Sequence, residues 1–319
     1  MQDTPDSNAG HVPVLTAAVL ELLAPRPGEV CLDCTIGRGG HASLILAKLS
    51  PGGRYLGFDA DPANVGFCRD RLAGRGAAVQ IVHSNFAAAG RVLGGLGIDR
   101  VDLLLADLGF ASCQMNDPSR GLSFANDGPL DMRYDPATAR CAADLVNELS
   151  EQEMADLIFT YGEERHSRKI ARKIAEARRQ SPIKMTRELA EIVRQACYTG
   201  RKPAGRGRRS RGVRIDPATR TFMALRIAVN GELEALRQLL DAMPRLLKPG
   251  GRAAIISFHS LEDRQVKQAF ARWHREGLAQ RLTKRVVTAD EHEQRNNPRS
   301  RSAKLRAIRW NASVTPDST

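Results

Sequence analysis

The sequence lacks the features that mark membrane and exported proteins. No apolar run among its 319 residues approaches the roughly 20 residues of a transmembrane helix. Segment 1–10 holds two acidic residues and no basic one, unlike a secretory signal or a transit peptide. We therefore expect a cytoplasmic protein.

Cysteine pairs at zinc-binding spacing are almost absent. Among six scattered cysteines, only Cys31 and Cys34 form a C-x-x-C pair, and no second Cys or His pair follows at ligand spacing. Cys31 falls in a predicted strand, where residues three apart point to opposite faces. We interpret both as small residues of a reduced core rather than as a zinc or redox pair, and we expect no metal.

Acidic residues are missing from two strongly basic segments, in a chain of net charge +12. The first segment, 201–214, holds seven cations, and the second, 295–309, holds six. Clustered cations neutralise phosphates and release counterions. A single charge run is usually a solvated loop, but two runs beside an enzymatic core favour a nucleic-acid partner.

Short strand patterns alternate with helical patterns at both ends of the chain. The predicted strands are Val30–Leu32, Arg54–Phe58, Val79–Val82, Val101–Ala106 and, after a turn at Lys248–Gly251, Ala253–Phe258. Strands separated by helices, such as His41–Leu49, predict an α/β fold with a parallel sheet and helices on both faces.

The middle of the chain shows helical patterns only. Residues 135–215 predict an inserted all-helical domain, with a capping box at Ser150–Glu153. The sheet domain would then comprise residues 1–134 and 216–319. Apolar residues from Phe222 to Met243 recur at helical spacing and predict one long helix, which Pro244 ends or kinks.

A glycine-rich turn, Asp33–His41, follows the first predicted strand and opens the first helix. Glycines allow positive φ and close approach of a ligand, and a helix N-terminus offers free N–H groups. The turn alone fits many nucleotides. Asp33 would repel a pyrophosphate but suits the cationic methionine end of S-adenosylmethionine.

Two residues at the ends of the next strands extend this prediction. Asp59 ends the second strand about 20 residues after Gly39, where a carboxylate binds ribose hydroxyls. Phe86 follows the third strand and could flank an adenine. Loop capping remains the alternative for Asp33 and Asp59, and core packing remains the alternative for Phe86.

Asp107 ends the fourth strand, before Leu108 and Gly109. Ligands of open α/β sheets sit beyond the carboxyl ends of the strands. A base amine is a poor nucleophile and needs an acceptor for its N–H. Asp107 is our candidate for that acceptor, with a cofactor contact as the alternative.

An ordered set of motifs resembles the ribosomal RNA small subunit methyltransferase H family. The motifs are His11–Leu15, Gly37–His41, Asp107–Gly109, Arg120–Phe124, Asp127–Arg133, Tyr161–Arg165, Pro217–Phe222, Ala224–Asn230 and Ile256–Asp263. Each piece is short, but together and in this order they are highly specific. The resemblance implies a class I (Rossmann-like) methyltransferase domain with an inserted helical domain that recognises the substrate.

The resemblance also implies a reaction, a partner and site residues. The implied reaction is N4-methylation of a decoding-centre cytosine in 16S rRNA, within the small ribosomal subunit. The implied contacts to S-adenosylmethionine are Gly39, Gly40, His41, Asp59, Phe86, Asp107 and Gln114, beside our own candidate Asp33. Ser112, Arg133, Arg220 and His259 are the substrate-side candidates, and the oligomeric state stays open.

Several residues depart from the family pattern, mostly on the substrate side. They are Ala111, Cys113, Met115, Asn116, Asp216 and Met223. These changes keep a non-catalytic small-subunit assembly factor as an alternative. A DNA amino-methyltransferase is a second alternative, although its tetrapeptide of Asn, Asp or Ser, two prolines and an aromatic is absent. A nicotinamide dehydrogenase is the least favoured.

Overall fold

The computed structural model describes residues 12–74, 77–110, 112–198 and 216–311. The chain divides into two compact units, and the first is built from two separate stretches, 1–111 and 233–319. The second unit is the stretch between them, 112–232. The second unit contains the segment 135–215 that was expected to form the helical insertion.

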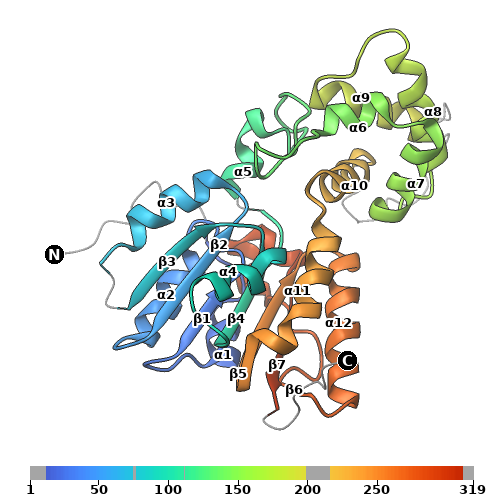
Figure 1. Cartoon of the computed structure of the whole chain (residues 1–319). Helices are drawn as coiled ribbons and strands as arrows, with labels where there is room; N and C mark the ends of the chain where they lie inside the picture. Colours follow the sequence, from blue (N-terminus) through green and yellow to red (C-terminus); the bar gives the residue numbers. More distant parts are fainter. Residues whose placement is uncertain (1–11, 75–76, 111, 199–215, 312–319) are drawn as a thin grey trace. The chain divides into compact units, whose positions relative to one another are not determined.

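The first unit is built on one seven-stranded sheet with the order β3-β2-β1-β4-β5-β7-β6 (Figure 1). Its strands are β1 (Val30–Asp33), β2 (Arg54–Asp59), β3 (Ala78–His83), β4 (Val101–Asp107), β5 (Leu247–Ser257), β6 (Ala279–Arg281) and β7 (Lys304–Trp310). The first five strands pair in parallel, as the sequence predicted. β7 runs antiparallel to β5 and β6. This order, with one reversed strand, is the class I methyltransferase sheet.

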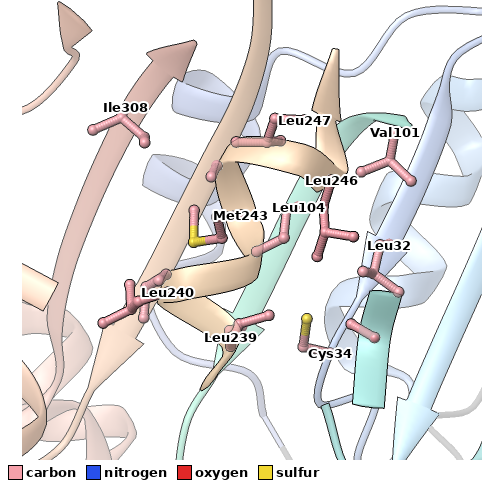
Figure 2. Packing of buried hydrophobic residues seen from close by; sticks show 14 of the residues in the cluster. Leu32, Cys34, Val101, Leu104, Leu239, Leu240, Met243, Leu246, Leu247 and Ile308 are labelled. Atoms are coloured by element: carbon pink, nitrogen blue, oxygen red, sulfur yellow. The ribbon is translucent and has the colours of Figure 1, made fainter. Parts of the chain in front are cut away.

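Helices cover both faces of this sheet. On one face lie α1 (Thr16–Leu23), α2 (Gly40–Leu49) and α3 (Pro62–Leu72), and on the other lie α4 (Ala89–Gly95), α11 (Glu232–Leu246) and α12 (Ser260–Arg275). Figure 2 shows Leu239, Leu240 and Met243 of α11 against Leu104 of β4. Cys31 and Cys34 are both buried, free and in opposite cores, which confirms their interpretation as core residues.

Short helices complete the first unit. They are η1 (Phe86–Ala88), α13 (Glu291–Asn296) and η3 (Pro298–Ser302). No helix in the described part of the chain is both long and apolar enough to cross a membrane.

The second unit is helical, as its periodicity predicted. It holds α5 (Ser112–Asn116), η2 (Pro118–Arg120), α6 (Ala142–Glu148), α7 (Glu151–Gly162), α8 (Ser167–Arg178), α9 (Thr186–Cys197) and α10 (Ala218–Asn230). The capping box at Ser150 is confirmed, since Ser150 and Glu153 each accept a backbone N–H of the other. The basic segment 201–214 lies outside the described residues.

Two local expectations were wrong. The single helix from Phe222 to Met243 is two helices, because Gly231 adopts φ 59° and ends α10 before α11 begins. The turn at Lys248–Gly251 lies inside β5, whose register with β4 shifts between Val101 and Leu103. Apolar spacing does not report a one-residue change of backbone direction, and the glycine at 231 was the one local signal of the break.

Candidate functional site

The carboxyl ends of three neighbouring strands bring three aspartates to one edge of the sheet. Asp33, Asp59 and Asp107 are the last residues of β1, β2 and β4. β1 lies between β2 and β4, and all three run in the same direction. The structure therefore gathers the acids that were predicted from the sequence to form a cofactor cleft.

The glycine turn bends sharply into α2. Gly37 has φ 53° and Gly39 has φ 74°, and Gly39 is the residue before the helix. These angles favour glycine over any residue with a Cβ. A Cβ on Gly40 would lie 2.9 Å from the Pro13 ring, so the family motif around Pro13 packs directly on the turn.

Asp59 fastens the glycine turn to the second strand. Its Oδ2 accepts the Gly37 N–H at 2.9 Å, and its Oδ1 accepts the Asp61 N–H at 2.8 Å. Asn64 adds a 3.3 Å contact to Oδ2. Burial raises the pKa of Asp59 to about 6, although these hydrogen bonds oppose the shift. Asp59 therefore caps the loop, which was the alternative to a cofactor contact. A carboxylate can still accept further hydrogen bonds.

Asp33 is buried beneath the turn, with 1% of its surface exposed. Its Oδ1 accepts the Thr35 N–H at 3.0 Å, and its Oδ2 accepts the Tyr55 hydroxyl at 2.5 Å. Burial raises the pKa of Asp33 to about 6, despite both hydrogen bonds. Asp33 therefore supports the turn from inside, and its contact to a cofactor stays a proposal.

His41 and Asp107 face each other at the carboxyl-terminal edge of the sheet. His41 Nε2 lies 3.5 Å from Asp107 Oδ2, and the side chains are 7% and 14% exposed. His41 Nε2 and Asp107 Oδ1 are buried without a hydrogen-bond partner among the described residues. Burial works to lower the pKa of His41, but the neighbouring Asp107 and the charges of Asp33 and Glu293 raise it overall. Buried polar atoms without partners are rare, and here they point to a ligand.

The raised pKa values predict how stability depends on pH. Each folded carboxyl, Asp33 and Asp59, holds its proton up to about pH 6, whereas the unfolded chain releases it near pH 4. Their stabilising contribution is thus full below about pH 4 and is lost as the pH rises through about 6. The pKa of His41 is also raised, so its contribution to stability is likewise lost as the pH rises, but at higher pH than for the two carboxyls.

We expect Asp33→Asn to flatten this dependence, because asparagine does not titrate. The measurement is the free energy of unfolding by urea at pH 4 to 7.5, compared between the two proteins. The difference in free energy of unfolding between the parent and the variant should change by roughly 1 to 3 kcal/mol between pH 4 and pH 7.5. Parallel curves for both proteins would contradict the assignment.

Two other candidates make contacts that explain them structurally. Phe86 begins η1 and packs, half-buried, against the core that contains α11. His259 precedes α12, where its Nδ1 accepts the Glu262 N–H at 3.4 Å. Its Nε2 lies 3.1 Å from Glu262 Oε1. The contacts of Phe86 agree with the alternative that it packs on the core. A substrate role for His259 stays a prediction.

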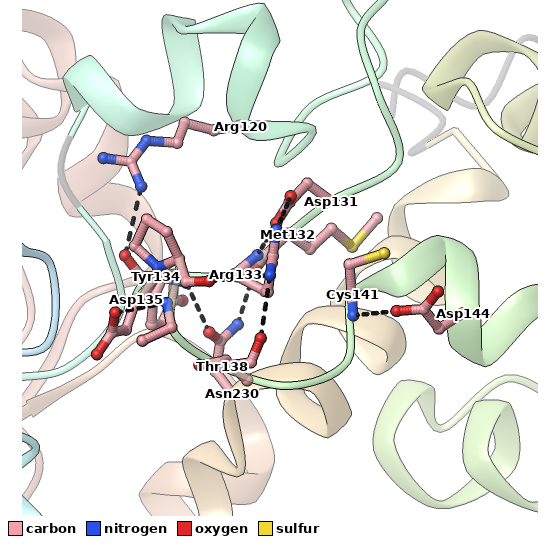
Figure 3. A network of polar contacts seen from close by, with 12 residues as sticks. Arg120, Asp131, Met132, Arg133, Tyr134, Asp135, Thr138, Cys141, Asp144 and Asn230 are labelled. Atoms are coloured by element: carbon pink, nitrogen blue, oxygen red, sulfur yellow. Dashed lines mark hydrogen bonds and ion pairs between the residues drawn. The ribbon is translucent and has the colours of Figure 1, made fainter.

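The remaining candidates belong to the second unit. Ser112 begins α5, and Gln114 of the same helix is 7% exposed. Arg133 donates to both oxygens of Asp131 and to two carbonyls of the same loop, as Figure 3 shows in part. Arg220 is 53% exposed, and its contacts with described residues are a 3.5 Å contact to Glu164 and a 3.3 Å bond to the Glu163 carbonyl. Arg133 thus orders its own loop, whereas Arg220 keeps most of its surface free.

Several side chains that hold the site together were not predicted from the sequence. Tyr55 lies outside the motifs, and Thr35 lies in the glycine turn but was given no role. Tyr55 donates to Asp33, and Thr35 Oγ1 accepts the Asp107 N–H at 2.6 Å. Arg299 was counted only as part of a basic run. Its Nη2 donates to the Phe110 carbonyl, and its guanidinium lies 5.7 Å from the Phe110 ring centroid. The C-terminal segment therefore fixes the loop that follows Asp107.

We expect Arg299→Ala to lower any catalytic rate of this site about tenfold, because the loop after β4 loses a charge-assisted hydrogen bond. Arg301→Ala is the matched control, since Arg301 lies exposed on the same short helix. Steady-state kinetics with both variants test this. Equal rates for the two variants would show that the Phe110 contact has no positioning role.

Comparison with known proteins places the chain in a family. It is 48% identical over 299 residues to ribosomal RNA small subunit methyltransferase H of Sorangium cellulosum, covering 94% of this chain and 90% of the relative. The protein of the same name from Syntrophobacter fumaroxidans is 46% identical, covering 93% of this chain and 95% of the relative. The one from Geobacter sulfurreducens is 47% identical, covering 93% of this chain and 97% of the relative. The model of the MraW methylase family matches residues 8–311. The chain belongs to the MraW methylase family.

Proposed function

We propose that this protein transfers a methyl group from S-adenosylmethionine to N4 of a cytosine in 16S rRNA of the small ribosomal subunit. The observation that carries the proposal lies at the carboxyl ends of the strands, where Asp107 Oδ1 and His41 Nε2 are buried without described partners beside a glycine turn. The relatives' shared name, ribosomal RNA small subunit methyltransferase H, supports the choice of substrate.

The residues at this edge of the sheet fit S-adenosylmethionine. Gly37 and Gly39 give the turn a backbone that a ligand can approach closely. Asp59, anchored at the end of β2, is the proposed contact to the ribose hydroxyls. Asp33, His41, Phe86 and Gln114 are the other proposed contacts, together with Gly40. When bound, the cofactor supplies an electrophilic methyl on a sulfonium centre.

Asp107 is proposed to hold the reacting amine. Its carboxylate accepts an N–H of the cytosine amino group, which orients the nitrogen lone pair for attack on the methyl. The Asp107 backbone is fixed by Thr35, and the following loop is fixed by Arg299. After transfer the substituted nitrogen releases a proton to solvent. Ser112, Arg133, Arg220 and His259 remain proposed substrate-side residues, and the helical insertion is the proposed recognition domain.

The test is mass spectrometry of 16S rRNA from a strain that lacks the gene. We expect a decoding-centre cytosine to lose its N4 methyl and to regain it when the purified protein and S-adenosylmethionine are added to the mutant small subunits. A cytosine that keeps its N4 methyl in the deletion strain would refute the proposal. Binding to subunits without transfer would favour the non-catalytic assembly factor, and transfer to DNA alone would favour a DNA methyltransferase.

A further inference from the structure

One face of α8 in the helical unit carries a dense stripe of cations. The buried face is apolar, with Ile170, Ala171, Ile174 and Ala175. The exposed cations are Arg165, just before the helix, then Arg168, Lys169, Arg172 and Lys173, and finally Arg179 after it. At 3.6 residues per turn, Arg168, Lys169, Arg172 and Lys173 fall on one side of the helix, and Arg165 and Arg179 flank its two ends. We call these six residues the α8 stripe.

Most of the α8 stripe is not neutralised by nearby acids. Arg165, Arg168, Lys169 and Arg179 make no hydrogen bond or ion pair with another described residue. Lys173 pairs with Glu176 at 2.7 Å, and Arg172 has a loose 3.7 Å contact to Glu151. The neighbouring α7 shows the opposite pattern, with Glu151, Glu153 and Asp156 and no cation. The two helices therefore differ in charge, since α7 is purely acidic and α8 is mostly basic.

The placement of the stripe works against local helix stability. Arg168 and Lys169 lie in the first turn of α8, which contains no acidic residue. The N-terminus of a helix carries partial positive charge, so cations are unfavourable there. Residues that lower the stability of their own helix, with no stabilising contact nearby, are expected to be there for function.

We propose that the α8 stripe binds the phosphate backbone of RNA, an inference that rests on the proposed function. Arg168 and Lys169 lie on the helix itself and have no ion-pair partner among the described residues. The basic segment 201–214 lies outside the described residues. Cations that contact phosphates contribute affinity without base readout, and their contribution falls with salt. The α8 stripe would thus strengthen and orient binding to the ribosomal RNA rather than choose the target base.

The test is the double variant Arg168→Glu/Lys169→Glu. Acids in the first turn are favourable for the helix, so the variant should melt at the same temperature as the parent or higher. Binding to 16S rRNA transcripts and to small subunits is measured across a salt series. We expect affinity near 0.15 M salt to fall about tenfold or more, and the slope of log affinity against log salt to decrease by about 2.

Lys48→Glu/Arg54→Glu is the matched control, with the same change in charge. Both residues are exposed, at the amino-terminal edge of the sheet, away from the strand ends that form the cleft. An equal loss of RNA affinity in the control and the α8 variant would overturn the proposal, as would unchanged RNA binding by the α8 variant. Weaker binding to subunits with unchanged binding to naked rRNA would assign the stripe to a protein surface instead, which also refutes it.

This experiment separates the stripe from the reaction. If the parent protein binds rRNA with the expected salt dependence but transfers no methyl group, the proposed function fails and the stripe stands. If the parent methylates the subunit and the α8 variant does so with unchanged KM, the stripe fails and the function stands.

Discussion

Asp107→Asn is expected to reduce methyl transfer about 100-fold or more, the range typical for loss of a catalytic polar contact. Asparagine keeps the shape of the side chain and the Asp107 N–H bond to Thr35. It replaces a charged acceptor by a neutral amide and removes the charge that helps to raise the pKa of His41. Single-turnover transfer to small subunits measures the chemical step directly.

The same variant decides which ligand Asp107 contacts. If the carboxylate holds the amine, the rate falls while calorimetry gives an unchanged dissociation constant for S-adenosylmethionine. If it holds the cofactor, affinity falls with the rate. Wild-type rate and affinity together would remove Asp107 from the site.

Asp102→Asn is the control for this experiment, since Asp102 lies on the same strand at the far end from the cleft. Its Oδ2 accepts the Val30 N–H and pairs with Lys248 Nζ, both at 2.8 Å. Loss of these contacts should cost about 1 kcal/mol of stability and leave the rate of transfer unchanged.

Asp59→Ala is expected to weaken cofactor binding about 100-fold. The substitution releases the Gly37 N–H and the Asp61 N–H, which now meet a carboxylate at 2.9 and 2.8 Å. Hydrogen bonds to charged groups contribute about 1.5 to 3 kcal/mol each, and about 1.4 kcal/mol corresponds to a tenfold change in affinity. The glycine turn loses its anchor, and the proposed ribose contact is lost as well.

Folding should also be weakened by this change, since two hydrogen bonds within the chain are lost, although burial already disfavours the charge of Asp59, whose pKa is raised to about 6. Titration calorimetry with S-adenosylmethionine, alongside thermal unfolding of the ligand-free protein, separates the two effects. Asp61→Ala is the control, since Asp61 caps α3 through the Ala63 N–H at 2.9 Å. It should cost about 1 kcal/mol of stability with little loss of affinity. Equal affinities for the two variants would contradict the role given to Asp59.

Much of the fold was predictable because its signals are local. The four early strands, α2 and the capping box of α7 each follow from short runs of residues with strong pattern. The antiparallel strand β7 was missed, since its residues Lys304–Trp310 mix cations with apolar residues and were interpreted only as part of a basic run. The break at Gly231 was missed because apolar spacing continues through it.

The cofactor candidates were predictable for a different reason. In parallel sheets, residues at the ends of successive strands meet at one edge, so Asp33, Asp59 and Asp107 could be grouped from their positions in the sequence. Tyr55 and Thr35 could not, because each acts through a single hydrogen bond to a residue on a neighbouring segment.

The sequence alone determined the family, the α/β class and the set of acids at the strand ends, since motifs and periodicity are properties of neighbouring residues. Only the tertiary structure decided what each acid does. Asp33 is turned inward to Tyr55, Asp59 holds the glycine turn, and Asp107 keeps a buried oxygen without a described partner beside His41. Arg299, which the sequence showed only as one cation of a basic run, likewise proves to contact the loop at Phe110. These roles depend on burial and on contacts between residues far apart in the chain, which no local pattern encodes.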